Sequence, residues 1–149
     1  MRAINHALTG AVIGVVSGNP WIALPVAVAS HFVVDAIPHH GNGDEVSGSQ
    51  LFAVSLVVDA LFCFGLVVLL AMWQPANWQL AAFCAFLATS PDFMWVGRFV
   101  RARRKLKPKR LNVVMRFHSQ VQWFQQPIGA VIEVVWFFAM SFVLYAVGH

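Results

Sequence analysis

Charged residues are scarce in this chain of 149 residues. Asp, Glu, Lys and Arg make up 11% of it, whereas a soluble domain carries about 25%. Hydrophobic residues account for 59%, and the mean hydropathy is +0.69. A soluble core of this size could not hide so much apolar surface. The composition therefore argues against a water-soluble domain and predicts an integral membrane protein with one domain, residues 1–149.

Cysteine is also rare. Cys63 and Cys84 both lie inside apolar runs, and they form no CxxC pair. Two such residues predict small buried side chains and exclude a disulfide framework or a thiol redox site.

The apolar residues fall into five segments, and a helix that spans a membrane needs about 20 residues. The segments cover residues 4–17, 21–37, 50–73, 78–96 and 127–147. The first is short, but His6 interrupts it and no A-x-A-like cleavage site follows, so we interpret it as a retained helix and not as a signal peptide. The predicted fold is all-α, a membrane bundle of about five transmembrane helices.

Lysine and arginine are almost confined to one stretch. Nine of the ten lie between residues 97 and 117, and Arg2 is the tenth. The positive-inside rule places that stretch in the cytoplasm, which also puts the N-terminus there and His149 outside an inner (cytoplasmic) membrane. We expect 97–117 to be an interfacial segment that binds anionic lipid head groups. Because the membrane topology already explains the cluster of Lys and Arg, we expect no nucleic acid partner.

The fourth segment contains a break signal, "TSPDFMW". Ser90 as N-cap, Pro91 in the first helical position and Asp92 in the first turn are typical of a helix start. We therefore expect the segment to break at Ser90 and to restart as a helix that enters the basic stretch. Such a break in a membrane helix is tolerated mainly where it lines a polar cavity or packs against protein.

Four of the six acids lie in or at the ends of apolar segments: Asp35, Asp59, Asp92 and Glu133. An acid at the centre of a membrane helix costs about 2.5–3.5 kcal/mol on insertion scales, so such residues usually face the bundle interior and serve a function. Two of these acids also have a simpler explanation. Asp59 could be hydrogen-bonded to a neighbouring helix, and Asp92 could be a charge that favours a helix N-terminus.

The topology places histidines and acids from all five segments at the cytoplasmic face. His31 and Asp35 are four residues apart, so they share one face of a helix and suit two ligands of one cation. Imidazole and carboxylate suit zinc, and also iron, manganese or nickel. We predict a site for one to three divalent ions, with zinc the preferred metal. The predicted ligands are His6, His31, Asp35, His39, Asp92 and His118, with His40 as the alternative to His39.

Four short motifs resemble a known family. "NHALTGAVIG", "SHFVVDAIPHH", "SPDF" and "RFHSQVQW" are similar to elements of small membrane-bound metal-dependent hydrolases, the YdjM-like group. "HFVVDAIPHH" also resembles the His-Tyr-x-x-Asp motif of zinc-dependent phospholipase C, in which the matching residues bind zinc. That likeness implies His31 and Asp35 as ligands. The following histidine comes earlier here, and Pro91-Asp92 lacks the histidine that follows it in the hydrolases.

Together, these patterns predict a metal-dependent hydrolase that cleaves a phosphoester in a lipid or lipid-linked substrate at the cytoplasmic face. Glu133 or Asp59 would act as general base, and Arg98 and Arg116 would bind the anionic head group. A serine nucleophile, Ser30 or Ser119, is a weaker mechanism. Two alternatives remain open: a proton- or cation-coupled transporter or channel component, and a structural metal-binding membrane protein.

Overall fold

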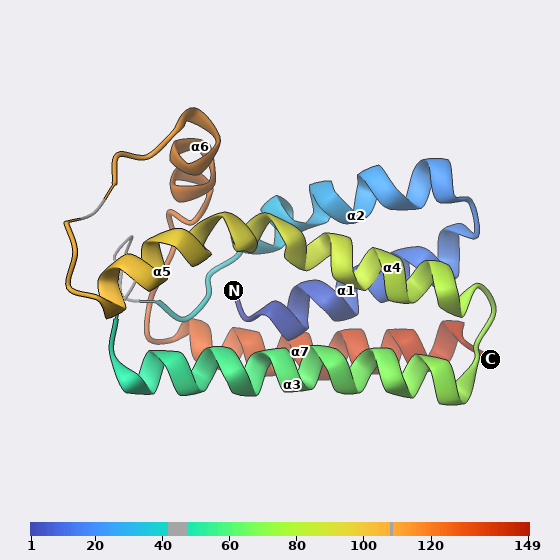
Figure 1. Ribbon diagram of the computed structural model, residues 1–149. Coiled ribbons are helices and arrows are strands. Elements are labelled where there is room, and N and C mark those ends of the chain that lie inside the picture. The colour runs from blue at the N-terminus through green and yellow to red at the C-terminus, as the bar shows by residue number, and fades with distance from the viewer. Residues whose placement is uncertain (42–47, 108) are drawn as a thin grey trace.

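The computed structural model describes residues 1–41, 48–107 and 109–149, and over those ranges it is all-helical, as the sequence predicts (Figure 1). The elements are α1 (Ala3–Ser17), α2 (Pro20–Asp35), α3 (Gln50–Trp73), α4 (Trp78–Thr89), the 3₁₀ helix η1 (Ser90–Trp95), α5 (Val96–Arg103), α6 (Val113–Val121) and α7 (Gly129–Val147).

Local signals fix several helix ends. The side chain of Asn19 accepts a hydrogen bond from the backbone of Trp21, and Ser49 and Asn112 do the same for Phe52 and Met115. These are N-caps, which satisfy backbone donors that have no partner inside the helix. At the end of α1, Gly18 adopts φ 57°, the left-handed conformation that glycine favours at a helix C-terminus.

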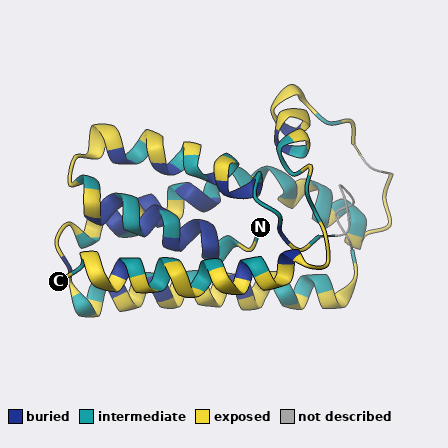
Figure 2. Ribbon diagram, turned by 180° about the vertical axis from the view of Figure 1, so that it is seen from behind, coloured by how far each residue is buried: buried dark blue, intermediate teal, exposed yellow. Residues whose placement is uncertain are grey.

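Helix α1 is the centre of the bundle. It packs against α2, α3, α4 and α7, and it lies between the pair α2 and α4 and the pair α3 and α7 (Figure 1). Figure 2 shows the outward faces of the long helices α3 and α7 largely exposed, as expected for helices surrounded by lipid.

Small residues allow α1 and α4 to approach closely. A Cβ atom added to Gly10 would collide with the carbonyl oxygen of Cys84, and one added to Gly14 would collide with the backbone of Ala81. The spacing Gly10-x-x-x-Gly14 is a common packing motif of membrane helices, because it lets two backbones meet. The buried Cys84 that lies in this contact has a free thiol, as predicted.

Three helical runs are long and apolar enough to cross a membrane: Gln50–Trp73, Trp78–Arg103 and Gly129–Val147. The five-segment prediction is therefore confirmed only in part. Helices α1 and α2 have 15 and 16 residues, or about 23 Å at 1.5 Å per residue, which is less than a hydrocarbon core of about 30 Å. Because α1 is surrounded by other helices, its length need not match the bilayer.

The predicted break in the fourth segment is present. α4 ends at Thr89, and the chain continues as the 3₁₀ helix η1 and then as α5. The predicted cap is wrong in one detail: the Ser90 hydroxyl does not cap the new helix but donates to the carbonyl of Leu87 one turn back. The change of helix type turns Asp92 toward the ends of α2 and α6, where the candidate site lies.

Candidate metal centre

Four side chains from three separate elements come together at one end of the bundle. His31 and Asp35 come from α2, Asp92 from η1 and His118 from α6, and one possible ligand atom from each lies within 4.8 Å of the other three. His31, Asp35 and His118 are fully buried, whereas 33% of the Asp92 side chain is exposed. The group therefore has a buried floor and one carboxylate that faces solvent.

The distances between these atoms suit a small cation. The Nε2 atoms of His31 and His118 are 3.0 Å apart, and Asp35 Oδ2 is 3.3 Å from the first and 2.9 Å from the second. Asp92 Oδ1 is 3.7 Å from both nitrogens. Four ligands placed about 2.05 Å from a tetrahedral zinc ion lie about 3.3 Å from one another. Five of the six separations, at 2.9–3.7 Å, bracket that value, and the sixth, between Asp35 and Asp92, is within 4.8 Å.

His31 is oriented as a metal-binding histidine. Its Nδ1–H donates to the carbonyl of Ala88 over 2.7 Å. In the neutral ring this leaves a lone pair on Nε2, the atom that faces Asp35, Asp92 and His118. A backbone carbonyl that accepts from the other ring nitrogen is the usual way in which proteins orient such a ligand.

His118 has the opposite proton arrangement. The indole N–H of Trp95 donates to its Nδ1 over 2.9 Å. A neutral ring that accepts at Nδ1 carries its proton on Nε2, and this Nε2–H donates to Asp35 Oδ2. A cation on Nε2 would need that proton to leave and Nδ1 to become protonated. The hydrogen bond from Trp95 would then be lost, so metal binding and this contact exclude each other.

Asp35 is the acceptor on which the site converges. Its Oδ1 accepts from the α-amino group of Met1 over 2.6 Å and from His6 Nε2 over 3.1 Å. Its Oδ2 accepts from His118 and from the side-chain amide of Gln122, both over 2.9 Å. A buried carboxylate is tolerated when charges and hydrogen bonds compensate it to this extent.

The other predicted histidine ligands lie outside the four-residue group. The ring of His6 stacks on that of His31, with centroids 4.1 Å apart, so His6 borders the group. His39 is buried, donates through Nδ1 to the carbonyl of Ile37, and has its pKa lowered by burial, so it is neutral at pH 7. His40 is exposed. The structure therefore does not bring either member of the His39–His40 pair into the group.

The deeper acids bind the N-terminus of α1. Asp59 on α3 accepts from the backbone N–H groups of Ala3 and Ile4, over 2.7 and 3.1 Å. Glu133 on α7 accepts from the backbone N–H of Arg2 over 3.1 Å. Carboxylates from two other helices thus cap α1 and compensate the positive end of its dipole. This matches the simpler explanation of Asp59, while a general-base role for either acid stays a prediction.

The predicted substrate-binding arginines differ in their positions. The guanidinium of Arg98 lies over the ring of Trp95, 5.7 Å from its centroid, and donates to the carbonyl of Lys109. Arg98 therefore borders the site through Trp95. Arg116 is exposed on α6. The Ser30 hydroxyl donates to the carbonyl of Ala27, so its recorded bond is to its own helix and not to a histidine.

Sequence reasoning missed three groups at the site: the side chains of Trp95 and Gln122 and the α-amino group of Met1. Gln122 follows His118 by four residues at the end of α6, so its spacing placed both side chains on one helix face and could have revealed it. Trp95 gave no such signal, because its contact with His118 depends on how η1 packs on α6.

Comparisons with known proteins give no match. No protein-family model matches the chain, and neither do any curated protein or solved structure. The resemblance to membrane-bound hydrolases therefore stays a prediction.

Proposed function

We propose that this protein is a membrane-embedded, metal-dependent hydrolase that cleaves a phosphoester in a lipid or lipid-linked substrate. The observation that carries the proposal is the convergence of His31, Asp35, Asp92 and His118, whose possible ligand atoms all lie within 4.8 Å of one another. A divalent ion held there, zinc by preference, would supply Lewis acidity and a nucleophilic water.

The residues of the site have separable roles in this proposal. Asp35 and His31 hold the ion from the buried side. Asp92, the one partly exposed carboxylate, exchanges protons with solvent. Arg98, which lies over Trp95, offers a cation for an anionic head group at the edge of the site. The orientation that fits this assignment has five membrane segments, with the site at the cytoplasmic face of the inner membrane and the basic segment bound to anionic lipids.

The distribution of polar side chains favours a one-sided site over a transport pathway. Among the described residues, the buried polar and charged side chains lie in the N-terminal halves of α1, α3 and α7, near the C-terminal ends of α2 and α4, or in the adjoining loop and α6. The rest of the core consists of Ala, Leu, Val and Cys. A proton or cation pathway would need polar groups through that apolar half.

Metal content and hydrolysis test the proposal together. Protein purified in detergent should contain close to one equivalent of a divalent metal by elemental analysis and should hydrolyse a nitrophenyl phosphodiester or a short-chain phospholipid. His31→Ala should lose the metal and at least about a hundredfold of the rate, because a ligand is missing. His40→Ala removes an exposed histidine and serves as the control. Metal-free wild-type protein with full activity would overturn the proposal, and a metal without hydrolysis would favour a structural metal site.

Trp95→Phe should strengthen metal binding. The change removes the indole N–H that holds His118 in the metal-free proton arrangement, a hydrogen bond worth about 1 kcal/mol. The dissociation constant for Co²⁺, followed by its visible absorption in apo-protein, should fall about fivefold. Trp123→Phe, in an exposed tryptophan, should leave it unchanged. Weaker binding in Trp95→Phe would mean that the indole supports the metal-bound state instead.

A further inference from the structure

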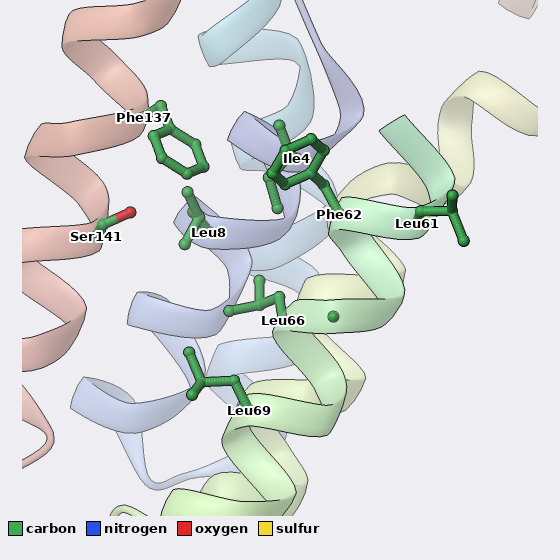
Figure 3. Close-up of a pocket in the computed structure, with 9 residues that line it drawn as sticks. Ile4, Leu8, Leu61, Phe62, Leu66, Leu69, Phe137 and Ser141 are labelled. Carbon is green, nitrogen blue, oxygen red and sulfur yellow. The ribbon is translucent and has the colours of Figure 1, made fainter. Parts of the chain in front are cut away.

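An apolar groove of about 350 Å³ runs along the bundle on the side of α3 and α7 (Figure 3). Ile4 and Leu8 of α1 form its floor. The other lining residues come from the two walls: Leu61, Phe62, Gly65, Leu66 and Leu69 of α3, and Phe137 and Ser141 of α7. Eight of these nine residues are apolar or glycine, and the only polar group is one hydroxyl.

The groove is separate from the candidate metal centre. Ile4 and Leu8 each lie two positions from His6 along α1. Side chains two positions apart in an α-helix point about 200° apart around the helix axis, so Ile4 and Leu8 lie on the opposite side of α1 from His6. The side chain of His6 reaches Asp35 on α2, whereas Ile4 and Leu8 face α3 and α7 in Figure 3. Helix α1 therefore lies between the two features, and the groove does not depend on the metal.

The walls of the groove show what surrounds it. Both α3 and α7 are long and apolar enough to cross a membrane. A groove that opens between two such helices faces lipid hydrocarbon and not water. Near its upper end the rings of Phe62 and Phe137 approach edge to face, with centroids 6.5 Å apart.

The dimensions of the groove suit a thin, flexible occupant. One turn of a helix about 10 Å wide and 5.4 Å long has a volume of about 420 Å³, which exceeds the whole groove. A helix from a second copy could therefore insert only side chains, whereas an acyl chain could lie in the groove along its length. The space above Gly65 is open, because a Cβ atom there would meet nothing within 4 Å.

We propose that this groove binds one acyl chain of a membrane phospholipid. The chain lies along α1 between α3 and α7, and its stabilisation comes from contact with apolar side chains over the length from Leu61 to Leu69. The groove is thus a lipid-binding site distinct from the metal centre.

Gly65→Phe fills the groove and tests this proposal. The protein is placed in phosphatidylcholine vesicles that contain a phosphatidylcholine with a photoreactive group on one acyl chain, and labelled residues are mapped by mass spectrometry. In the wild type we expect labelling concentrated on the lining residues, and in Gly65→Phe a reduction of at least fivefold there. Ala60→Phe, an exposed position on α3 outside the groove, is the control and should keep the wild-type pattern.

Three results would overturn the proposal. They are labelling spread evenly over the outward faces of α3 and α7, equal labelling in Gly65→Phe and wild type, and labelling of the lining residues that falls when the protein self-associates at a higher protein-to-lipid ratio. Thermal unfolding followed by circular dichroism checks that each variant is folded, and Gly65→Leu replaces Gly65→Phe if the larger ring is not accommodated. Unchanged metal content in these variants separates this test from that of the metal centre.

Discussion

Replacing Asp35 with alanine should destabilise the protein by about 3–5 kcal/mol, the usual cost of leaving buried charged partners uncompensated. Asp35 accepts hydrogen bonds from His6, His118, Gln122 and the α-amino group of Met1. The two histidine donors could not hydrogen-bond to water instead, because they and the carboxylate are fully buried. Since a domain is stable by about 5–15 kcal/mol in total, the loss should be large. Denaturation in mixed micelles, followed by circular dichroism, measures it.

Asp92→Ala is the matched control for this result. Asp92 belongs to the same four-residue group, but a third of its side chain is exposed, and its oxygen lies 3.7 Å from each histidine. In metal-free protein its removal should lower stability by less than about 1 kcal/mol, as for an exposed ion pair, and in metal-loaded protein it should abolish metal binding. Equal stability losses in the two metal-free variants would contradict the role of Asp35 as the shared acceptor of the polar cluster.

The sequence predicted which end of the bundle carries the polar groups, because that prediction needed only helix direction. The positions of lysine and arginine set the topology, and antiparallel helices then bring the end of α2 near the start of α7. The spacing of His31 and Asp35 and the break at Ser90 followed from local rules that the structure obeys, whereas His118 was predicted as a ligand from its place at the same membrane face.

The sequence could not predict which polar residues share a partner, because that depends on how the helices are rotated. The shared membrane face predicted His6 as a ligand and Asp59 and Glu133 as general-base candidates. In the structure, α1 begins beside Asp59 and Glu133, so its backbone N–H groups reach these acids first. Capping by a carboxylate on another helix leaves no sequence signature, unlike the local caps Asn19 and Asn112.

Asp59→Ala separates these two interpretations of the deeper acids. The change leaves the N–H groups of Ala3 and Ile4 without an acceptor in a part-buried position and removes a charge from the positive end of α1. Each lost hydrogen bond to a charged group is worth about 1.5 kcal/mol. We therefore expect a loss of about 3 kcal/mol in the free energy of unfolding, measured in the same micelles, with the metal content unchanged.

Asp59→Asn sharpens the test, because the amide keeps one oxygen acceptor at the same place and loses only the charge and one bond. If Asp59 is a cap, the asparagine variant should recover about half of the stability that alanine loses, and its residual hydrolysis should follow the folded fraction. If Asp59 is instead the general base, asparagine should be as inactive as alanine while remaining folded, because an amide cannot accept a proton from water. Because the oxygens of Asp59 already bind two backbone N–H groups in a fixed geometry, we expect the first outcome.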